Sequence, residues 1–185
     1  MACTALTKGR GLDCNRISGG IKNIYFGVYD QFTAPITTTG IVEASGEITD
    51  IEMASNVLYR YTTPLGVASL SETITGSKEN GTIFYTPTVT VILNRLTKED
   101  QNQIKLLASN RLVIFLELNE VLTANSHNVL LALGLENGME LNAGTNATGT
   151  AFGDMNGYDW TFDGMERDAM VTVADYTTTP LDNSA

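Results

Sequence analysis

Hydrophobic and polar residues alternate along much of this chain, as they do in a β-strand whose two faces differ. The longest alternating stretch is Gly66–Leu96, in which Leu70 and Ile74 share one face. Asn80-Gly81 in its middle predicts a tight primed turn, because that turn needs positive φ angles. Each arm of this hairpin has about 9–11 residues, against a usual five or six, and reaches roughly 30 Å. Pro87 has no N–H to donate and places its arm at a sheet edge or a bulge.

Eight further segments have strand character. Arg111–Asn119 is continuously apolar, which is typical of a central, buried strand, and Asn128–Leu135 is similar. Asn137-Gly138 and Asn156-Gly157 are two more hairpin signals. The remaining predicted strands are Gly20–Asp30, Ile41–Glu52, Val57–Tyr61, Tyr158–Phe162 and Ala169–Val173, with a short "MEL" strand at 139–141.

One segment has the period of a helix, at about 97–109. Thr97 and Asp100 form a capping-box variant at its start, and apolar residues then recur at helical spacing. Asn110 is a plausible left-handed stop. The pattern predicts a mainly β protein, an antiparallel sandwich or barrel with one flanking helix and a protruding hairpin. The single domain spans 20–175, between an extended arm at 1–19 and a polar tail at 176–185.

Composition and charge narrow the possible partners. Threonine supplies 25 of 185 residues, which favours pleated sheet. The net charge is −10, but the first 22 residues hold four bases against one acid, so the rest carries −13. An acidic surface repels nucleic acid. The charge either serves solubility alone or lets the basic arm, through Lys8, Arg10 and Arg16, dock on the acidic face of a neighbouring copy.

The residues predict no catalytic, cofactor-binding or metal-binding site, and we do not expect an enzyme. His127 is the only histidine and reads as an ordinary loop residue; Cys3 and Cys14 form no metal-ligand pattern. Asp154–Asp159 resembles the start of a calcium loop but departs from it after Asn156. The cysteine usage suggests a reduced, cytosolic origin, and neither a secretory signal nor a membrane-spanning stretch is visible. Paired carboxylates could still meet in space.

A long ribbon with unpaired edge groups invites strands from other molecules. We therefore expect a self-assembling building block, whose contacts between copies include the arm and the hairpin tip. The expected contact residues are Lys8, Arg10, Arg16, Ser77, Lys78, Glu79, Asn80, Gly81 and Thr82.

Three stretches carry a resemblance to a known family: "GTIFYTPTVTVILNRLTKEDQNQIKLLASNRLVIFLELN", "LGLENGMEL" and "GDMNGYDWTFDGMER". Over Val67–Arg167 the order of elements resembles virion proteins of tailed bacteriophages, most of all tail tube proteins. The resemblance implies a small β-sandwich or barrel whose copies form hexameric rings stacked into a hollow tube, with the hairpin bridging subunits.

The same resemblance implies a location and partners. The protein would be assembled in the host cytoplasm and reside in the virion tail. It would contact other copies of itself and virion proteins such as the tape measure and the tail terminator. DNA would pass through an acidic lumen without specific binding, and neither a cofactor nor a membrane is implied.

Two alternatives remain open from the sequence. A capsid decoration or head–neck protein is also β-rich and acidic, but it would stay monomeric or trimeric until it met a capsid. A carbohydrate-binding or adhesin module would need exposed aromatic side chains on one face. Tyr158 and Trp160 share a face and could stack on a sugar, although a single Trp on a strand more often lies in the core.

Overall fold

The computed structural model describes residues 17–32, 41–44, 47–51, 58–122 and 127–173. It contains eleven strands, a 3-10 turn (η1, Tyr29–Gln31) and one α-helix (α1, Lys98–Ser109). The strands are β1 (Ile21–Val28), β2 (Ile41–Ala44), β3 (Glu47–Ile51), β4 (Tyr59–Thr62), β5 (Ala68–Ser77), β6 (Thr82–Asn94), β7 (Leu112–Leu122), β8 (His127–Leu133), β9 (Glu140–Ala147), β10 (Gly157–Asp163) and β11 (Val171–Val173). The basic arm residues Lys8, Arg10 and Arg16, and the tail at 176–185, lie outside the described residues.

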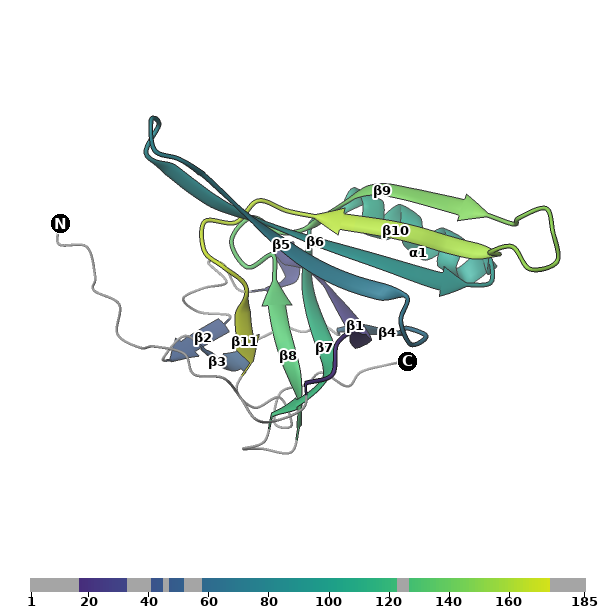
Figure 1. Cartoon of the computed structure of the whole chain (residues 1–185), viewed down its shortest axis with the longest axis horizontal. Helices are drawn as coiled ribbons and strands as arrows, with labels where there is room; N and C mark the ends of the chain where they lie inside the picture. Colours follow the sequence, from purple (N-terminus) through teal and green to yellow (C-terminus); the bar gives the residue numbers. More distant parts are fainter. Residues whose placement is uncertain (1–16, 33–40, 45–46, 52–57, 123–126, 174–185) are drawn as a thin grey trace.

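The strands form two sheets that pack together, so the predicted β-sandwich with one helix is confirmed (Figure 1). One sheet has the order β2-β3-β11-β8-β7-β1-β4, and the other has the order β5-β6-β10-β9. The pairings are antiparallel except between β3 and β11, which run parallel. No helix in the described part of the chain has the length and apolar character that crossing a membrane requires.

The main core lies between the two sheets. Ile24 and Phe26 of β1 face Trp160 and Phe162 of β10, and all four side chains are buried. The rings of Phe26 and Phe162 are 5.0 Å apart between centroids, within the range of favourable aromatic pairs. This packing joins the sheets into one sandwich.

A second core lies on the opposite face of the seven-stranded sheet. Because side chains alternate along a strand, Val113 and Phe115 of β7 point into it while Ile114 points into the main core. All three are fully buried, and Leu58 and Phe32 pack against this second face. β7 is therefore buried on both sides, as its continuous apolar run predicts.

The helix begins as predicted but ends differently. The Thr97 hydroxyl accepts a hydrogen bond from the Asp100 N–H at 3.1 Å, which confirms Thr97 as the N-cap. Asn110 is not a left-handed stop, because its φ is −118°. Its side-chain amide instead donates to the Leu106 carbonyl at 2.8 Å and satisfies a carbonyl that the helix end leaves free.

Two other predictions about secondary structure are wrong. Ile41–Glu52 is not one strand but the antiparallel pair β2 and β3. His127 lies at the start of β8, paired with Leu122, rather than in a loop.

None of the three Asn-Gly pairs forms the predicted two-residue hairpin turn. The β5–β6 turn has four residues, 78–81, and only Gly81 has a positive φ, at +65°. Asn137-Gly138 connects strands of different sheets. Gly157 begins β10, where a side chain would lie 2.1 Å from the Leu93 carbonyl oxygen, so the glycine serves close backbone approach.

Candidate self-assembly surface

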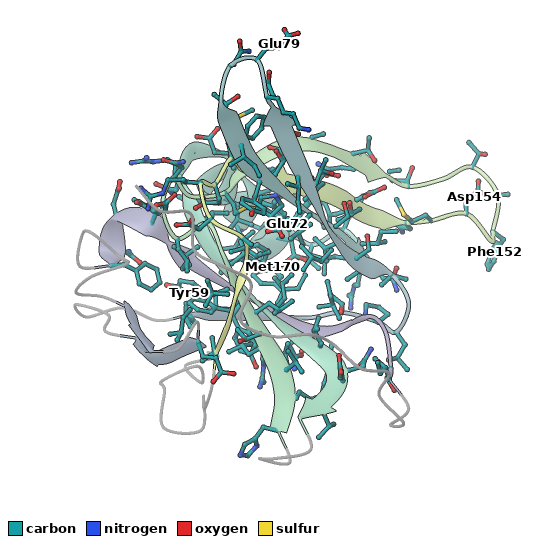
Figure 2. All side chains as sticks on the ribbon, turned by 60° about the vertical axis from the view of Figure 1, so that its left-hand side comes forward. Tyr59, Glu72, Glu79, Phe152, Asp154 and Met170 are labelled. Atoms are coloured by element: carbon teal, nitrogen blue, oxygen red, sulfur yellow. The ribbon has the colours of Figure 1, made fainter. Side chains whose placement is uncertain are left out.

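The hairpin of β5 and β6 projects beyond the sandwich as a two-stranded ribbon (Figure 1). Its cross-strand pairs run without interruption from Ala68–Val91 to Ser77–Thr82. This confirms the long hairpin. In Figure 2 its tip, labelled at Glu79, is remote from the body of the molecule.

The tip residues expected to contact a neighbour lie together at the end of the ribbon. Lys78, Glu79, Asn80, Gly81 and Thr82 are exposed, and Ser77 is half-buried. The Ser77 hydroxyl accepts a hydrogen bond from the Asn80 N–H at 3.3 Å, which helps to hold the four-residue turn. The structure therefore presents these six residues as a compact polar end, and their role in contacts between copies stays a prediction.

The face of the hairpin that lines the core near the body continues along the ribbon into solvent. Near the body this face buries Ala68 and Val91, but farther out it exposes Ile74 by 62% and Ile83 by 59%. Met165 and Met170, in the segment that follows β10, are exposed beside the ribbon. We call these four side chains the hairpin patch: Ile74, Ile83, Met165 and Met170. Grouped exposed apolar residues mark interaction sites more often than single ones do.

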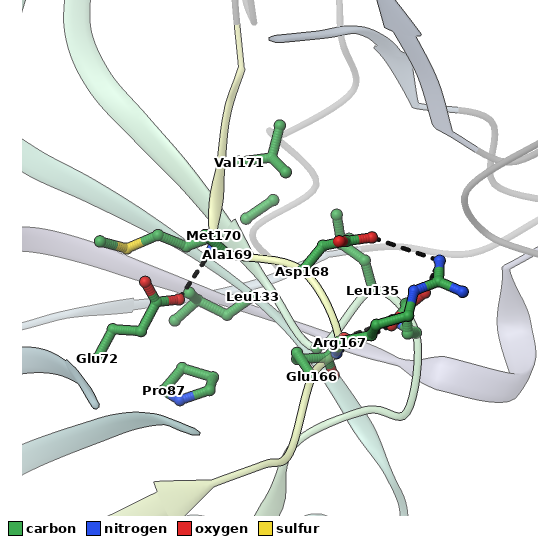
Figure 3. A pocket seen from close by; sticks show the side chains of 13 residues that line it. Glu72, Pro87, Leu133, Leu135, Glu166, Arg167, Asp168, Ala169, Met170 and Val171 are labelled. Carbon is green, nitrogen blue, oxygen red and sulfur yellow. Dashed lines mark hydrogen bonds and ion pairs between the residues drawn. The ribbon is translucent and has the colours of Figure 1, made fainter. Parts of the chain in front are cut away.

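Residues 164–170, which we call the strap, fix the base of the ribbon. Tyr85 and Glu166 exchange two backbone hydrogen bonds of 2.8 Å, and the Gly164 N–H donates to the Pro87 carbonyl at 3.3 Å. The Met170 N–H donates to the Glu72 carboxylate at 2.9 Å (Figure 3). Pro87 thus lies just beyond the last β10 pairing, at Thr88, where the outer part of β6 leaves the four-stranded sheet.

Buried charge links the strap to the turn after β8. The Glu166 carboxylate accepts the N–H groups of Glu136 at 2.9 Å and Asn137 at 3.2 Å. Burial raises the pKa of Glu166, and the neighbouring Glu136 charge adds to this, while the backbone hydrogen bonds act in the opposite direction. Glu136 in turn forms an ion pair with Arg167 at 2.6 Å. These contacts set the direction in which the ribbon leaves the body.

The strap, β8 and the ribbon enclose a cavity of about 250 Å³, lined by Glu72, Glu166 and Asp168 among others (Figure 3). Glu72 and Glu166 already accept backbone N–H groups. In the described part of the chain, no three His, Cys, Asp or Glu residues are arranged to hold a metal ion. Among the described residues that line the cavity there is no histidine, serine or cysteine, the side chains from which a nucleophile–histidine site is built.

Both outer strands of the four-stranded sheet are open. Within the described ranges, β5 pairs only with β6, and β9 pairs only with β10. Neither edge strand contains Lys, Arg or Pro, the residues that commonly prevent strand addition. Among the described strands, the four-stranded sheet therefore has two edges that pair with no further strand, on its opposite sides.

The outward face of this sheet is polar. Ser69, Thr90 and Thr161 lie side by side across three of its strands, opposite the buried aromatic face. The four strands contain no Lys or Arg. Glu140, Asp159 and Asp163 lie on this outward face, whereas Glu72 lies on the opposite face with Ala68 and Leu70. Such a face has no group with which to bind a phosphate backbone.

Two candidate binding features from the sequence, an aromatic platform for a sugar and the start of a calcium loop, are not found in the structure in the form that binding requires. Tyr158 and Trp160 are fully buried and pack on each other, so they offer no platform for a sugar. The Asp154 carboxylate accepts hydrogen bonds from Thr150 and Ala151, which occupies the group that suggested a calcium loop.

Sequence reasoning did not identify the strap or its Glu166–Glu136 contacts. The strap has no periodic pattern, and its partners lie about 30 and 80 residues away in the chain. Comparison with protein-family models, with curated proteins and with solved structures finds no significant match to this chain.

Proposed function

We propose that this chain is a structural virion protein that assembles with copies of itself, as hexameric rings stacked into a hollow tail tube of a bacteriophage. The observation that carries the proposal is the projecting ribbon, with an open edge strand and an exposed apolar face. Exposing Ile74 and Ile83 on a ribbon with an open edge does not stabilise a monomer. A neighbouring copy that adds a strand to this edge, or buries these side chains, would use the open edge and the apolar face.

The two open edges of the four-stranded sheet support ring formation. β5 of one copy can pair with β9 of the next, and the two strands are different surfaces of the same molecule. Such a head-to-tail contact closes into a ring when the rotation between copies divides a full turn. The four-stranded sheets would then form a continuous wall, with the apolar face of each inside its own sandwich.

The polar face of that wall suits the passage of DNA. This face carries the acids Glu140, Asp159 and Asp163 and no base, so a lumen lined by it would repel rather than hold the phosphate backbone. The tape measure and the tail terminator would be further partners. The basic arm at 1–19, with Lys8, Arg10 and Arg16, would dock on the acidic body of a neighbour.

Shortening the ribbon tests the proposal. A variant that lacks 76–83, with Thr75 and Phe84 joined by a two-residue turn, retains every core residue of the hairpin. We expect it to be folded and monomeric, while the parent chain forms rings or tubes under negative-stain electron microscopy. A full-length control, Lys98→Ala with Glu99→Ala, removes one basic and one acidic side chain from the exposed start of α1, away from the ribbon, and should still assemble.

Two results would count against the proposal. Tubes formed by the shortened variant would show that the ribbon is not the connector. A parent chain that stays monomeric or trimeric at high concentration, in light scattering as well as in micrographs, would favour the decoration or head–neck protein instead.

A further inference from the structure

Three Asn-Gly pairs occur in this chain, at Asn80-Gly81, Asn137-Gly138 and Asn156-Gly157. Asparagine is a chemically labile residue. When glycine follows it, the next backbone nitrogen can attack the side-chain carbonyl carbon, because glycine has no side chain to hinder the approach. The reaction requires both groups to be free to meet. The contacts of the asparagine amide and of the glycine therefore distinguish the three pairs.

At Asn137-Gly138 both reacting groups are held. The Asn137 side-chain amide donates to the Met165 carbonyl at 2.6 Å. The Asn137 N–H donates to the Glu166 carboxylate at 3.2 Å, and the buried Gly138 adds a backbone hydrogen bond to the same carboxylate. Attack by the Gly138 nitrogen would therefore require the strap to separate from the turn after β8.

At Asn156-Gly157 the glycine is held. Gly157 is buried at the start of β10, where it pairs with Asn94 of β6 and Ala147 of β9. The Asn156 carbonyl accepts the Arg95 N–H at 2.7 Å, which fixes the peptide group between Asn156 and Gly157. The Gly157 nitrogen cannot turn toward the Asn156 side chain unless this end of the four-stranded sheet opens.

At Asn80-Gly81 both reacting groups are free. The two residues are exposed at the end of the ribbon, next in the chain to Glu79, which Figure 2 labels. The Asn80 N–H donates to the Ser77 hydroxyl at 3.3 Å, but no described residue forms a hydrogen bond with the Asn80 side-chain amide or the Gly81 N–H. The space around the Gly81 Cα is open as well. The ring-closing attack meets no structural obstacle at this pair.

We propose that Asn80 is a self-modification site, which converts to aspartate and isoaspartate without an enzyme. The Gly81 nitrogen attacks the Asn80 Cγ and gives up its proton, and the side-chain nitrogen leaves as ammonia, so that a succinimide ring forms. Water then opens the ring at one of its two carbonyl groups. One opening gives aspartate, and the other gives isoaspartate, in which the main chain runs through Cγ. One water is consumed and one ammonia is released, with no change of oxidation state.

The conversion changes both the charge and the backbone of the ribbon tip. Lys78 and Glu79 balance each other within 77–82, so conversion of Asn80 leaves one net negative charge there. The chain after its first 22 residues is strongly acidic, so a charged tip is repelled by the body of a neighbouring copy. Isoaspartate also lengthens the backbone of the four-residue turn by one carbon. We expect converted molecules to assemble less well. This consequence rests on the proposed self-assembly, whereas the conversion itself does not.

Peptide mapping by mass spectrometry tests the site. The monomeric fraction of the parent chain is incubated in mildly alkaline buffer, and the asparagine, aspartate and isoaspartate forms of the three peptides are quantified over time. We expect Asn80 to convert at least about tenfold faster than Asn137 and Asn156, because the latter two must first be released by local opening. In denaturant, where these contacts are absent, the three rates should agree within about threefold.

Asn80→Gln is the matched control for this measurement. The Asn80 side chain has no hydrogen bond to lose among the described residues, so the variant should keep the circular dichroism spectrum of the parent. Its longer side chain would close a larger ring, and position 80 should stay unmodified over the same time. Equal rates at the three pairs in the native chain would overturn the proposal. An Asn80 that converts in denaturant but not in the native chain would overturn it as well.

Assembly of aged chains tests the consequence separately. Parent chain and Asn80→Gln are compared before and after ageing, with fresh Asn80→Asp as the charged form. We expect the aged parent and Asn80→Asp to need an assembly concentration at least about threefold higher in sedimentation velocity, as one unfavourable surface charge costs. Asn80→Gln should not change on ageing. Unchanged assembly of both charged forms would show that the tip charge has no effect on the contact. If the parent chain never assembles, the proposed function fails, and the peptide map still decides whether Asn80 converts.

Discussion

The two sheets of the sandwich differ in how many of their faces are buried. The centre of the seven-stranded sheet is covered on both sides, so that Ile114 and Phe115, neighbours on β7, lie in different cores. The four-stranded sheet buries one face, around Trp160, and leaves the other polar and its two edges open. The comparison predicts that the first sheet contributes most to stability, and the proposed self-assembly would use the second sheet.

The largest effect should come from emptying the second core. Phe115→Ala removes a fully buried ring that lies 6.5 Å from the ring of Phe32, between centroids. We expect the free energy of unfolding to fall by about 3–5 kcal/mol, as in other large-to-small core substitutions. Chemical denaturation measures it. Thr161→Ala, on the polar face of the four-stranded sheet, is the control and should cost less than about 1 kcal/mol.

Comparable losses at Phe115 and Thr161 would remove the distinction between the sheets. Assembly of the control variant can be measured as well. Thr161→Ala should leave the rings or tubes unchanged, because the polar face is not proposed as a contact between copies.

A smaller effect is expected at Glu117, the buried acid of the seven-stranded sheet. Its carboxylate accepts hydrogen bonds from Asn23 at 2.6 Å, Lys22 at 3.0 Å and Tyr25 at 3.1 Å. Burial acts to raise the pKa of Glu117, but the hydrogen bonds of Asn23, Lys22 and Tyr25 and the charge of Lys22 outweigh it and lower the pKa below the ordinary 4.5. Glu117→Ala leaves these donors without their acceptor and should cost about 1–3 kcal/mol.

The pH dependence at Glu117 follows from the lowered pKa. The carboxylate stabilises the fold fully above its ordinary pKa, and that contribution disappears as the pH falls through the lowered value. Denaturation of the parent chain and of Glu117→Ala at a series of pH values should therefore show a difference that shrinks toward low pH. A difference that grows on acidification would contradict the assignment.

The sequence predicts the strongly patterned half of the molecule and little of the rest. Alternation over the hairpin, the apolar run of β7 and the Thr97 cap each depend on neighbours in the chain, and each is confirmed. Only the start of β9 falls within the predicted strand at 139–141, and the rest of β9 was missed because Gly144 reads as a loop residue. A side chain there would lie 3.1 Å from the Trp160 ring, so this glycine makes room for Trp160 within a strand.

The functional surfaces were predicted least well where they depend on contacts distant in sequence. The ribbon and its tip follow from Gly66–Leu96 alone, so the expected residues Ser77–Thr82 lie where the pattern places them. The exposure of Ile74 and the position of the strap follow from tertiary packing.

The smallest expected effect concerns the buried acid that serves the four-stranded sheet. Glu166→Gln keeps one acceptor oxygen, which can accept the N–H of either Glu136 or Asn137. The amide NH2 group of the glutamine then faces the N–H of the other residue, so that one hydrogen bond is lost. We expect a loss of at most about 1 kcal/mol at neutral pH, less than at Glu117, because burial of the Glu166 charge already opposes folding. Exposed Glu140→Gln on β9 is the matched control and should have no measurable effect.

The pH dependence at Glu166 should have the opposite sign to that at Glu117. Because burial raises the pKa of Glu166, its protonation favours the fold, and that gain is complete below the ordinary pKa and lost as the pH rises through the raised one. Parent chain and Glu166→Gln, unfolded by denaturant from about pH 3 to about pH 7, should differ most in favour of the parent at the acid end. Parallel pH profiles would show that Glu166 has an ordinary pKa. The base of the ribbon would then be held by the backbone hydrogen bonds of the strap, without any contribution from a perturbed carboxyl group.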